Sequence, residues 1–206
     1  MGLEDIEVIN YFKNKENGFY VDVGCYHPIH RNNTHLLHKK GWNGITIDVS
    51  KFSVDLFNYL RPNDLNYNFA VSNKNKIVKL YFQKELSQLS TIEYEQAKKF
   101  LQGKIKEKEI QALTLDEILS RDKYINKKID FLNIDVEGAE MDVLKKLDFK
   151  QYDPSLICIE ILGYRELERD DREKKIKEDY IYKFLVEKGY KKVWSGSSYC
   201  SHLFTK

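Results

Sequence analysis

The chain has 206 residues, the length of one ordinary domain with enough material for a full hydrophobic core. Hydrophobic residues make up 42% and charged residues 32%, a balance that excludes a disordered tail and a membrane protein. Its 34 basic and 32 acidic side chains leave a net charge of +2, which argues against a dedicated nucleic-acid-binding protein with a strongly basic face.

The cysteines and the amino-terminal segment indicate the cellular compartment in which the protein is expected. Cys25, Cys158 and Cys200 form no C-x-x-C pair, and free thiols are typical of a reducing compartment. Residues 1–17 are expected to contain an acidic, amphipathic helix and lack the basic region and apolar run of a signal peptide. No apolar run is long enough to span a bilayer. We therefore expect a cytoplasmic protein without a membrane span.

Apolar runs of strand length recur along the chain. They are continuous rather than alternating, which is typical of parallel strands buried on both faces. The expected strands are Phe19–Val23, Ile45–Ile47, Phe69–Val71, Ile77–Phe82, Ile129–Val136 and Leu156–Leu162, with a closing hairpin of Lys191–Trp194 and His202–Thr205 joined by a Gly/Ser turn.

Helical patterns fill the connections between these runs. Two pairs with the spacing of a capping box, Ser90 with Glu93 and Thr114 with Glu117, predict helix starts. Further helices are expected over Asn33–Lys40, Gly138–Leu147 and a stripe from Ile176 to Leu185. The alternation predicts an α/β fold with a mostly parallel sheet. We expect one domain, 1–206, with a helical insertion at 84–112 and a charged loop or helix at 165–180.

The turn after the first expected strand is a candidate ligand site. In open α/β sheets, ligands bind outside the carboxyl ends of the strands. Asp22 and Gly24 stand there, followed by Cys25 and Tyr26, but the G-x-G-x-x-G pattern that cradles a pyrophosphate is missing. An acid beside a single glycine favours a ligand without phosphates, such as S-adenosylmethionine.

An acid after the second strand supports this interpretation. Asp48 ends the run Ile45–Ile47, where a carboxylate can accept hydrogen bonds from both hydroxyls of a ribose. We expect Val49 and Ser50, which follow it, to contribute to the same nucleoside site.

The strongest chemical signal lies at the end of the run Ile129–Val136. Buried charges inside a strand would be costly, so Asp135 and Glu137 are expected at its open end, projecting into the crevice. The alternative is that one of them caps the helix that starts near Gly138, where a carboxylate interacts well with the helix dipole.

Four of the five histidines stand close together in the sequence: His27, His30, His35 and His38. Their spacing invites a metal site, but no cysteine or carboxylate is interleaved with them, so no metal ligand is predicted. His27 lies in the turn after the first strand, where it is a candidate for substrate binding or for a general base.

Taken in order, several segments resemble the FkbM family of S-adenosylmethionine-dependent methyltransferases. The resemblance runs from about Gly18 to Leu162, and IDVEGAE is its most specific block. The segments that carry it are FYVDVGCYHP, NNTHLLHKKGWNGITID, NFAVSN, LTLDEIL, IDFLNIDVEGAEMDVLKKL and ICIEIL.

The resemblance implies a Rossmann-like class I methyltransferase fold. Its sheet would have seven strands, the last of them antiparallel, with helices on both faces. The family is mostly composed of O-methyltransferases that act on sugars of surface glycans or on secondary metabolites.

The resemblance also implies roles for individual residues. Asp22 and Gly24 would form the first cofactor motif, with Cys25 and Tyr26 standing where the family often has Ala-Asn or a further glycine. Asp48 would bind the ribose, and Ala70 and Val71 would line the adenine side. Asp135 and Glu137 would lie nearest the transferred methyl group. The acceptor would contact His27, Asn33 and Glu160.

Three questions stay open on the sequence alone. Asp135, Glu137 or His27 could take the proton from the acceptor, or the carboxylates could hold a divalent cation, although no metal is predicted. A metal-dependent hydrolase or lyase that uses Asp135, Glu137 and Glu160 is the alternative enzyme, and a cofactor-fold protein without turnover is the non-catalytic alternative. The expected partner is a small-molecule or glycan acceptor rather than a nucleic acid, and the oligomeric state is not predicted.

Overall fold

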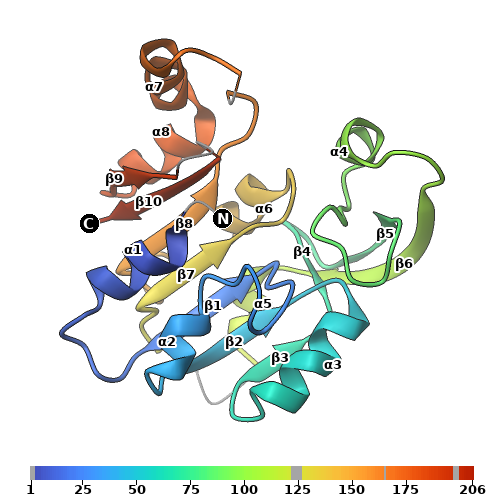
Figure 1. Ribbon diagram of the computed structural model, residues 1–206, viewed down its shortest axis with the longest axis horizontal. Coiled ribbons are helices and arrows are strands. Elements are labelled where there is room, and N and C mark those ends of the chain that lie inside the picture. Colours follow the sequence, from blue (N-terminus) through green and yellow to red (C-terminus); the bar gives the residue numbers. More distant parts are fainter. Residues whose placement is uncertain (1–2, 122–126, 165, 197–199) are drawn as a thin grey trace.

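A seven-stranded sheet forms the centre of the molecule in the computed structural model, which describes residues 3–121, 127–164, 166–196 and 200–206 (Figure 1). The strand order is β3-β2-β1-β7-β8-β10-β9. The five strands from β3 to β8 are parallel, and β10 runs antiparallel to β8 and to β9. The strands are β1 (Phe19–Val23), β2 (Asn43–Ile47), β3 (Leu65–Tyr67), β7 (Phe131–Ile134), β8 (Leu156–Glu160), β9 (Lys191–Ser195) and β10 (Ser201–Thr205). The predicted α/β class, mostly parallel sheet and closing hairpin are confirmed.

Helices cover both faces of this sheet (Figure 1). Alternate strand residues bury their side chains in two separate cores. One core holds α1 and α2 with Tyr20 and Phe131, and the other holds α5, α6 and α8 with Val21 and Leu132. The helices are α1 (Glu4–Tyr11), α2 (His35–Lys39), α3 (Lys51–Leu60), α4 (Tyr94–Phe100), α5 (Leu115–Leu119), α6 (Glu140–Lys145), α7 (Arg169–Glu178) and α8 (Tyr180–Glu187).

A second, three-stranded sheet lies beside the first, with α4 near its outer end (Figure 1). Its strands β4 (Ala70–Val71), β5 (Lys76–Phe82) and β6 (Lys106–Leu113) are ordered β4-β6-β5. Two expected strands, Phe69–Val71 and Ile77–Phe82, therefore belong here, and the third strand of the main sheet is instead β3.

The prediction of a helical insertion over 84–112 is wrong at its carboxyl end, because residues 106–112 belong to β6 and the helix in this range is α4. The sequence of β6 begins with four charged residues and continues as Ile-Gln-Ala-Leu, in which the apolar residues are buried and the glutamine is exposed. A search for continuous apolar runs misses a strand of this kind.

The observed helix caps confirm one of the predicted helix starts and contradict another. The Thr114 side chain accepts a hydrogen bond from the Glu117 amide at 3.2 Å, so that capping prediction is confirmed. The prediction for Ser90 is wrong, because α4 begins after Glu93 without a side-chain cap. The stripe expected from Ile176 to Leu185 is divided at Asp179, which is extended and caps α8.

Within the described residues, no helix combines the length and the apolar composition needed to cross a bilayer. Three predictions extend beyond the described residues. They concern residues 1–2 of the amino-terminal segment, Arg165 of the charged segment and residues 197–199 of the Gly/Ser turn.

Candidate active site

A cavity of about 760 Å³, part of it open to solvent, lies at the carboxyl ends of β1, β2, β4 and β7. In the sheet, β2 and β3 lie on one side of β1, whereas β7 and β8 lie on its other side. The strand order therefore reverses between β1 and β7, and ligands of open α/β sheets bind at such a point. Of the site residues expected from the sequence, the cavity is lined by Asp22, Gly24, Cys25, Tyr26, Asn33, Asp48, Val49, Ala70, Val71 and Asp135.

Asp22 is a structural anchor beneath the cavity as well as part of its lining. Its carboxylate has no solvent exposure and accepts hydrogen bonds from Asn32 Nδ2 at 3.0 Å, Thr34 Oγ1 at 2.8 Å and Asn133 Nδ2 at 2.8 Å. Sheet register places Asn133 directly beside Asp22. Burial raises the pKa of Asp22, and the Asn133 and Thr34 hydrogen bonds oppose that shift.

Arg61 completes this buried network, and the sequence gives no direct signal of its role. It follows α3 and is 1% exposed. Its guanidinium donates to Thr34 Oγ1 at 2.9 Å, to Asn32 Oδ1 at 2.8 Å and to the Pro28 carbonyl. The arginine therefore fixes the loop from residue 28 to residue 34 and compensates the buried charge of Asp22.

Asp48 joins the turn after β1 to the start of α3. One carboxylate oxygen accepts from the Tyr26 amide and the other from the Ser50 amide, each at 2.7 Å. Burial raises the pKa of Asp48 to about 6. Each oxygen keeps further acceptor capacity, so the carboxylate can still bind hydroxyls in the cavity. Ser50 does not line the cavity; its side chain caps α3.

Gly24 is required by the protein backbone itself. Its φ is +81°, and a Cβ there would lie 1.7 Å from the carbonyl oxygen of Asp135. The close approach brings the ends of β1 and β7 together, where the Asp135 amide donates to the Val23 carbonyl at 2.9 Å. Gly24 is therefore needed for this close contact between the ends of the two strands.

Gly24→Ala is expected to lower the free energy of unfolding by about 2–4 kcal/mol, because backbone strain and overpacking add. Gly41→Ala is the matched control: its φ is +93°, but nothing lies within 4 Å of the added Cβ, so only the strain remains. Urea unfolding of both variants measures the difference. Equal losses in the two variants would contradict this account of Gly24.

The second sheet and the segment after it close one side of the cavity. Phe69, Ala70 and Val71 form an apolar part of the cavity lining, and the adenine-side role that the resemblance implies for Ala70 and Val71 stays a prediction. Residues from the 84–112 insertion complete the lining, and the Thr91 hydroxyl ties that segment to the main sheet by donating to the Glu137 carbonyl at 3.0 Å. The insertion therefore helps to form the site.

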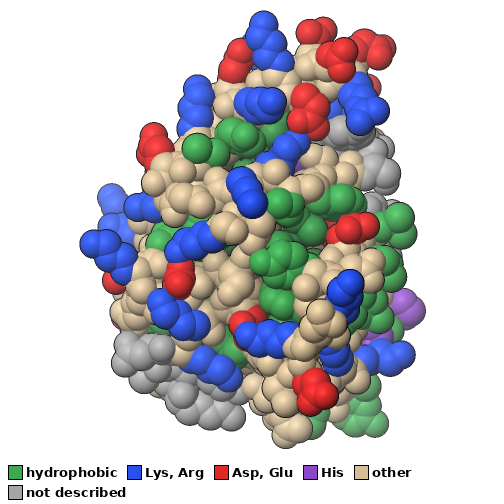
Figure 2. All heavy atoms as spheres, turned by 90° about the vertical axis from the view of Figure 1, so that its left-hand side faces the viewer, with side chains coloured by type: hydrophobic (Ala, Val, Ile, Leu, Met, Phe, Trp, Pro, Cys, Tyr) green, Lys and Arg blue, Asp and Glu red, His purple; other side chains and the backbone are tan. Residues whose placement is uncertain are grey.

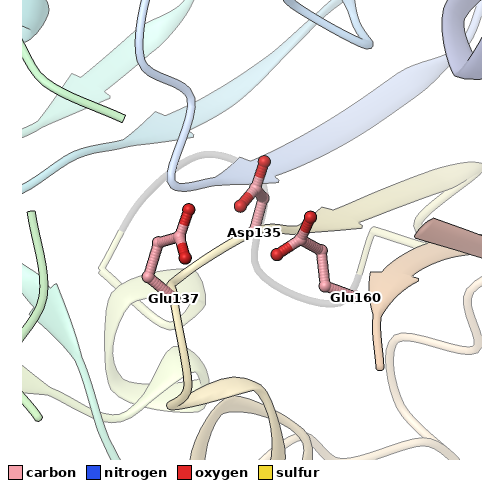
Figure 3. A group of neighbouring side chains, drawn as sticks. All are labelled: Asp135, Glu137 and Glu160. Atoms are coloured by element: carbon pink, nitrogen blue, oxygen red, sulfur yellow. The ribbon is translucent and has the colours of Figure 1, made fainter. Parts of the chain in front are cut away.

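Three carboxylates converge at the ends of β7 and β8 (Figure 3). Parallel register pairs Ile134 with Ile159, so the next residues, Asp135 and Glu160, lie side by side. Glu137 comes back towards them from a tight turn with φ of +52°, followed by Gly138 at +105°. One oxygen of each carboxylate lies within 4.8 Å of the others.

Crowding and burial favour the protonated forms of these acids. Burial and then Glu140 raise the pKa of Glu137 to about 7. Burial followed by the neighbouring carboxylates raises the pKa of Asp135 and of Glu160 well above the usual range. Neither Asp135 nor Glu137 caps α6, whose N-cap is Ala139 without a side-chain bond, so the capping alternative is wrong.

Glu137→Gln is expected to stabilise the protein at pH 8 by about 2 kcal/mol and to have little effect at pH 5. The folded-state pKa of about 7 lies above the usual value of 4.5, so the folded protein binds the proton more tightly. Stability is therefore lost as pH rises between these two values. Thermal unfolding at both pH values checks this, with the exposed Glu187→Gln as control. An effect of E137Q that is equal at both pH values would be inconsistent with the raised pKa.

His27 does not line the cavity, so the expectation that it faces the crevice is wrong. Its Nδ1 accepts hydrogen bonds from the Ile29 and His30 amides, each at 3.1 Å, which form a tight turn around the ring nitrogen. Burial lowers the pKa of His27. The turn after β1 therefore uses this histidine to fix its own backbone.

Among the residues that the structure describes, the carboxylates Asp135, Glu137 and Glu160 are the group whose donor atoms are close enough to share a cation. None of the four clustered histidines belongs to such a group. Buried Nδ1 atoms of His35 and His38 have no hydrogen-bond partner, and burial lowers the pKa of both rings.

The family model of the methyltransferase FkbM domain matches residues 22–192. This range contains every strand that borders the cavity except the first three residues of β1, together with all three clustered carboxylates. The chain therefore belongs to the FkbM methyltransferase family, as its resemblance implied. No curated protein and no solved structure matches it.

Proposed function

We propose that this protein is an S-adenosylmethionine-dependent methyltransferase that methylates a hydroxyl group on a sugar, a surface-glycan precursor or another small molecule. The observation that carries the proposal is the cavity at the reversal of strand order, lined by Asp22, Asp48 and Asp135 in a chain of the FkbM family. The seven-stranded, mostly parallel sheet with an antiparallel β10 supports the Rossmann-like class I methyltransferase fold that the resemblance implies.

The chemistry of the cavity suits this cofactor better than a nucleotide phosphate. Three aspartates in the lining would repel a pyrophosphate, and Gly24 is the single glycine of its turn. The same charges favour a sulfonium and an ammonium group. An apolar wall of Phe69, Ala70 and Val71 beside Asp48 provides a surface for a base next to an acceptor for ribose hydroxyls.

When bound, S-adenosylmethionine would supply an electrophilic methyl group. Asp48 would hold the ribose, and the loop fixed by Arg61 would keep Asn33 against the strand ends. The carboxylates of Asp135, Glu137 and Glu160 would accept the hydrogen bond of an acceptor hydroxyl and take its proton. Because a base must be ionised, the raised pKa of Glu137, about 7, suits it to this task near neutral pH.

A neutral polyol is the acceptor that the site favours. A cluster of carboxylates binds hydroxyl donors and repels phosphate-rich chains. On the face that lies to the left in Figure 1, basic side chains are spread among acidic and apolar ones (Figure 2). These features support a small-molecule or glycan acceptor over a nucleic acid. The buried free cysteines Cys25 and Cys158 are compatible with a cytoplasmic location.

Two other functions predict different results. A metal-dependent hydrolase or lyase built on the three carboxylates would need a bound metal and would not respond to S-adenosylmethionine; the family membership does not favour it. A protein that has lost turnover would bind the cofactor and transfer no methyl group.

The selectivity of the cavity tests the proposal. S-Adenosylhomocysteine at a hundredfold excess over its dissociation constant should stabilise the fold by about 2.7 kcal/mol, visible as a rise in melting temperature. ATP and NAD, which share the adenosine but carry phosphates, should give no comparable rise. A larger shift with either phosphate-bearing ligand than with S-adenosylhomocysteine would overturn the assignment.

A further inference from the structure

Arg31 is the one basic side chain among the described residues that line the cavity. The carboxylate side chains that share the lining with it are those of Asp22, Asp48 and Asp135. Arg31 is therefore the side chain of this lining that can form an ion pair with a negatively charged group of a ligand.

The guanidinium is held in place by a neutral partner. Arg31 Nη1 donates to Gln88 Oε1 at 2.6 Å, a contact between the loop after β1 and the 84–112 insertion. Within the described part of the chain, no carboxylate forms an ion pair with Arg31. A hydrogen bond to a neutral amide is weaker than one to a carboxylate, so a ligand carboxylate can replace or join Gln88.

Arg31 belongs to the loop after β1, which also contacts the end of β7. Two residues further on, Asn33 donates to Asn133 Oδ1 at 2.9 Å, and Asn133 in turn donates to Asp22. The proposed nucleoside wall, Asp48 with Phe69–Val71, is formed by other segments. The loop that carries Arg31 therefore also contacts the strand ends that remain for the amino-acid end of the cofactor.

We propose that Arg31 binds the carboxylate of the amino-acid end of S-adenosylmethionine, in exchange for its contact with Gln88. This assignment rests on the proposed function. It also accounts for charge balance in the cavity: the aspartates suit the sulfonium and the ammonium, whereas the carboxylate would be repelled by all three without Arg31.

The test compares two probes that differ only in this carboxylate, S-adenosylmethionine and its decarboxylated form. Arg31→Met is expected to weaken binding of S-adenosylmethionine about tenfold to a hundredfold, the usual range for a hydrogen bond to a charged group. It should change the affinity for the decarboxylated form by less than about twofold. Arg31→Lys keeps the charge without the planar fork and should give an intermediate loss.

Lys39→Met is the matched control. It removes the same charge from an exposed side chain of α2 outside the cavity lining and should leave both affinities unchanged. Calorimetric titration gives the affinities, and thermal unfolding verifies that each variant is folded.

The outcomes separate the two proposals. If the wild type binds S-adenosylmethionine and Arg31→Met weakens both probes equally, or neither, the assignment of Arg31 is wrong while the proposed function stands. If the wild type binds neither probe, the proposed function fails and the assignment of Arg31 with it. Loss confined to the probe with the carboxylate supports both.

Discussion

Asp135→Asn is expected to reduce methyl transfer by at least about a hundredfold, the usual contribution of a positioned general base. Asparagine keeps the shape of the side chain but removes both its ionisation and its ability to take a proton. Asp135 is the member of the carboxylate cluster that also lines the cofactor cavity. It therefore lies where the two substrates would meet.

The fold should survive this change. Burial and the neighbouring acids raise the pKa of Asp135, so the charged form is disfavoured in the folded protein without a ligand, and a neutral amide relieves that cost. The positive sulfonium of a bound cofactor would lower this pKa again and favour the ionised form that acts as a base. The melting temperature of the variant should equal or exceed that of the wild type. Asp142→Asn, on α6 outside the cavity lining, is the control for a neighbouring acid. Full turnover in the Asp135 variant would remove this residue from the mechanism.

Arg61→Met is expected to lower the free energy of unfolding by about 3–5 kcal/mol, the usual cost of breaking a buried charged pair. The change removes the guanidinium that donates to Thr34, Asn32 and the Pro28 carbonyl. It also removes the cation that lowers the pKa of the buried Asp22 and Asp64. The loss of stability should be accompanied by weaker cofactor binding, because the loop from residue 28 to residue 34 borders the cavity.

Urea unfolding measures the effect of Arg61→Met. Lys51→Met removes an exposed cation that pairs with Asp55 on α3, and it should cost no more than about 1 kcal/mol. Arg61→Lys keeps the charge with fewer donors and should lie between the wild type and Arg61→Met. If Arg61→Met were as stable as Lys51→Met, the buried network would not be a main support of the site.

The sequence was most informative where burial is complete. Every residue of β1, Phe19–Val23, is buried, and its continuous apolar run predicted both ends of the strand. Asp22 was identified because it stands at the carboxyl end of that run, where ligands bind in open α/β sheets. The cost of a charge inside a buried strand pointed to Asp135, whose position beside Glu160 then follows from sheet register.

The features that could not be predicted from the sequence depend mostly on how segments of the chain pack against one another. Arg61 resembles a surface residue at a helix end, and only the packing of α3 against the loop after β1 buries it. His27 looked like a base because it follows β1, but backbone amides two and three residues later engage its Nδ1. The three residues of β3 are half-buried at a sheet edge and carry too weak a pattern to be recognised.

Calorimetric titration of the wild-type protein with S-adenosylhomocysteine tests the central claim most directly. The cavity offers an acid for the ribose, an apolar wall for the base and charges of both signs for the amino-acid end. We expect binding to one site per chain with a dissociation constant in the micromolar range. No detectable heat at millimolar ligand, at two temperatures, would contradict the assignment of this cavity to S-adenosylmethionine.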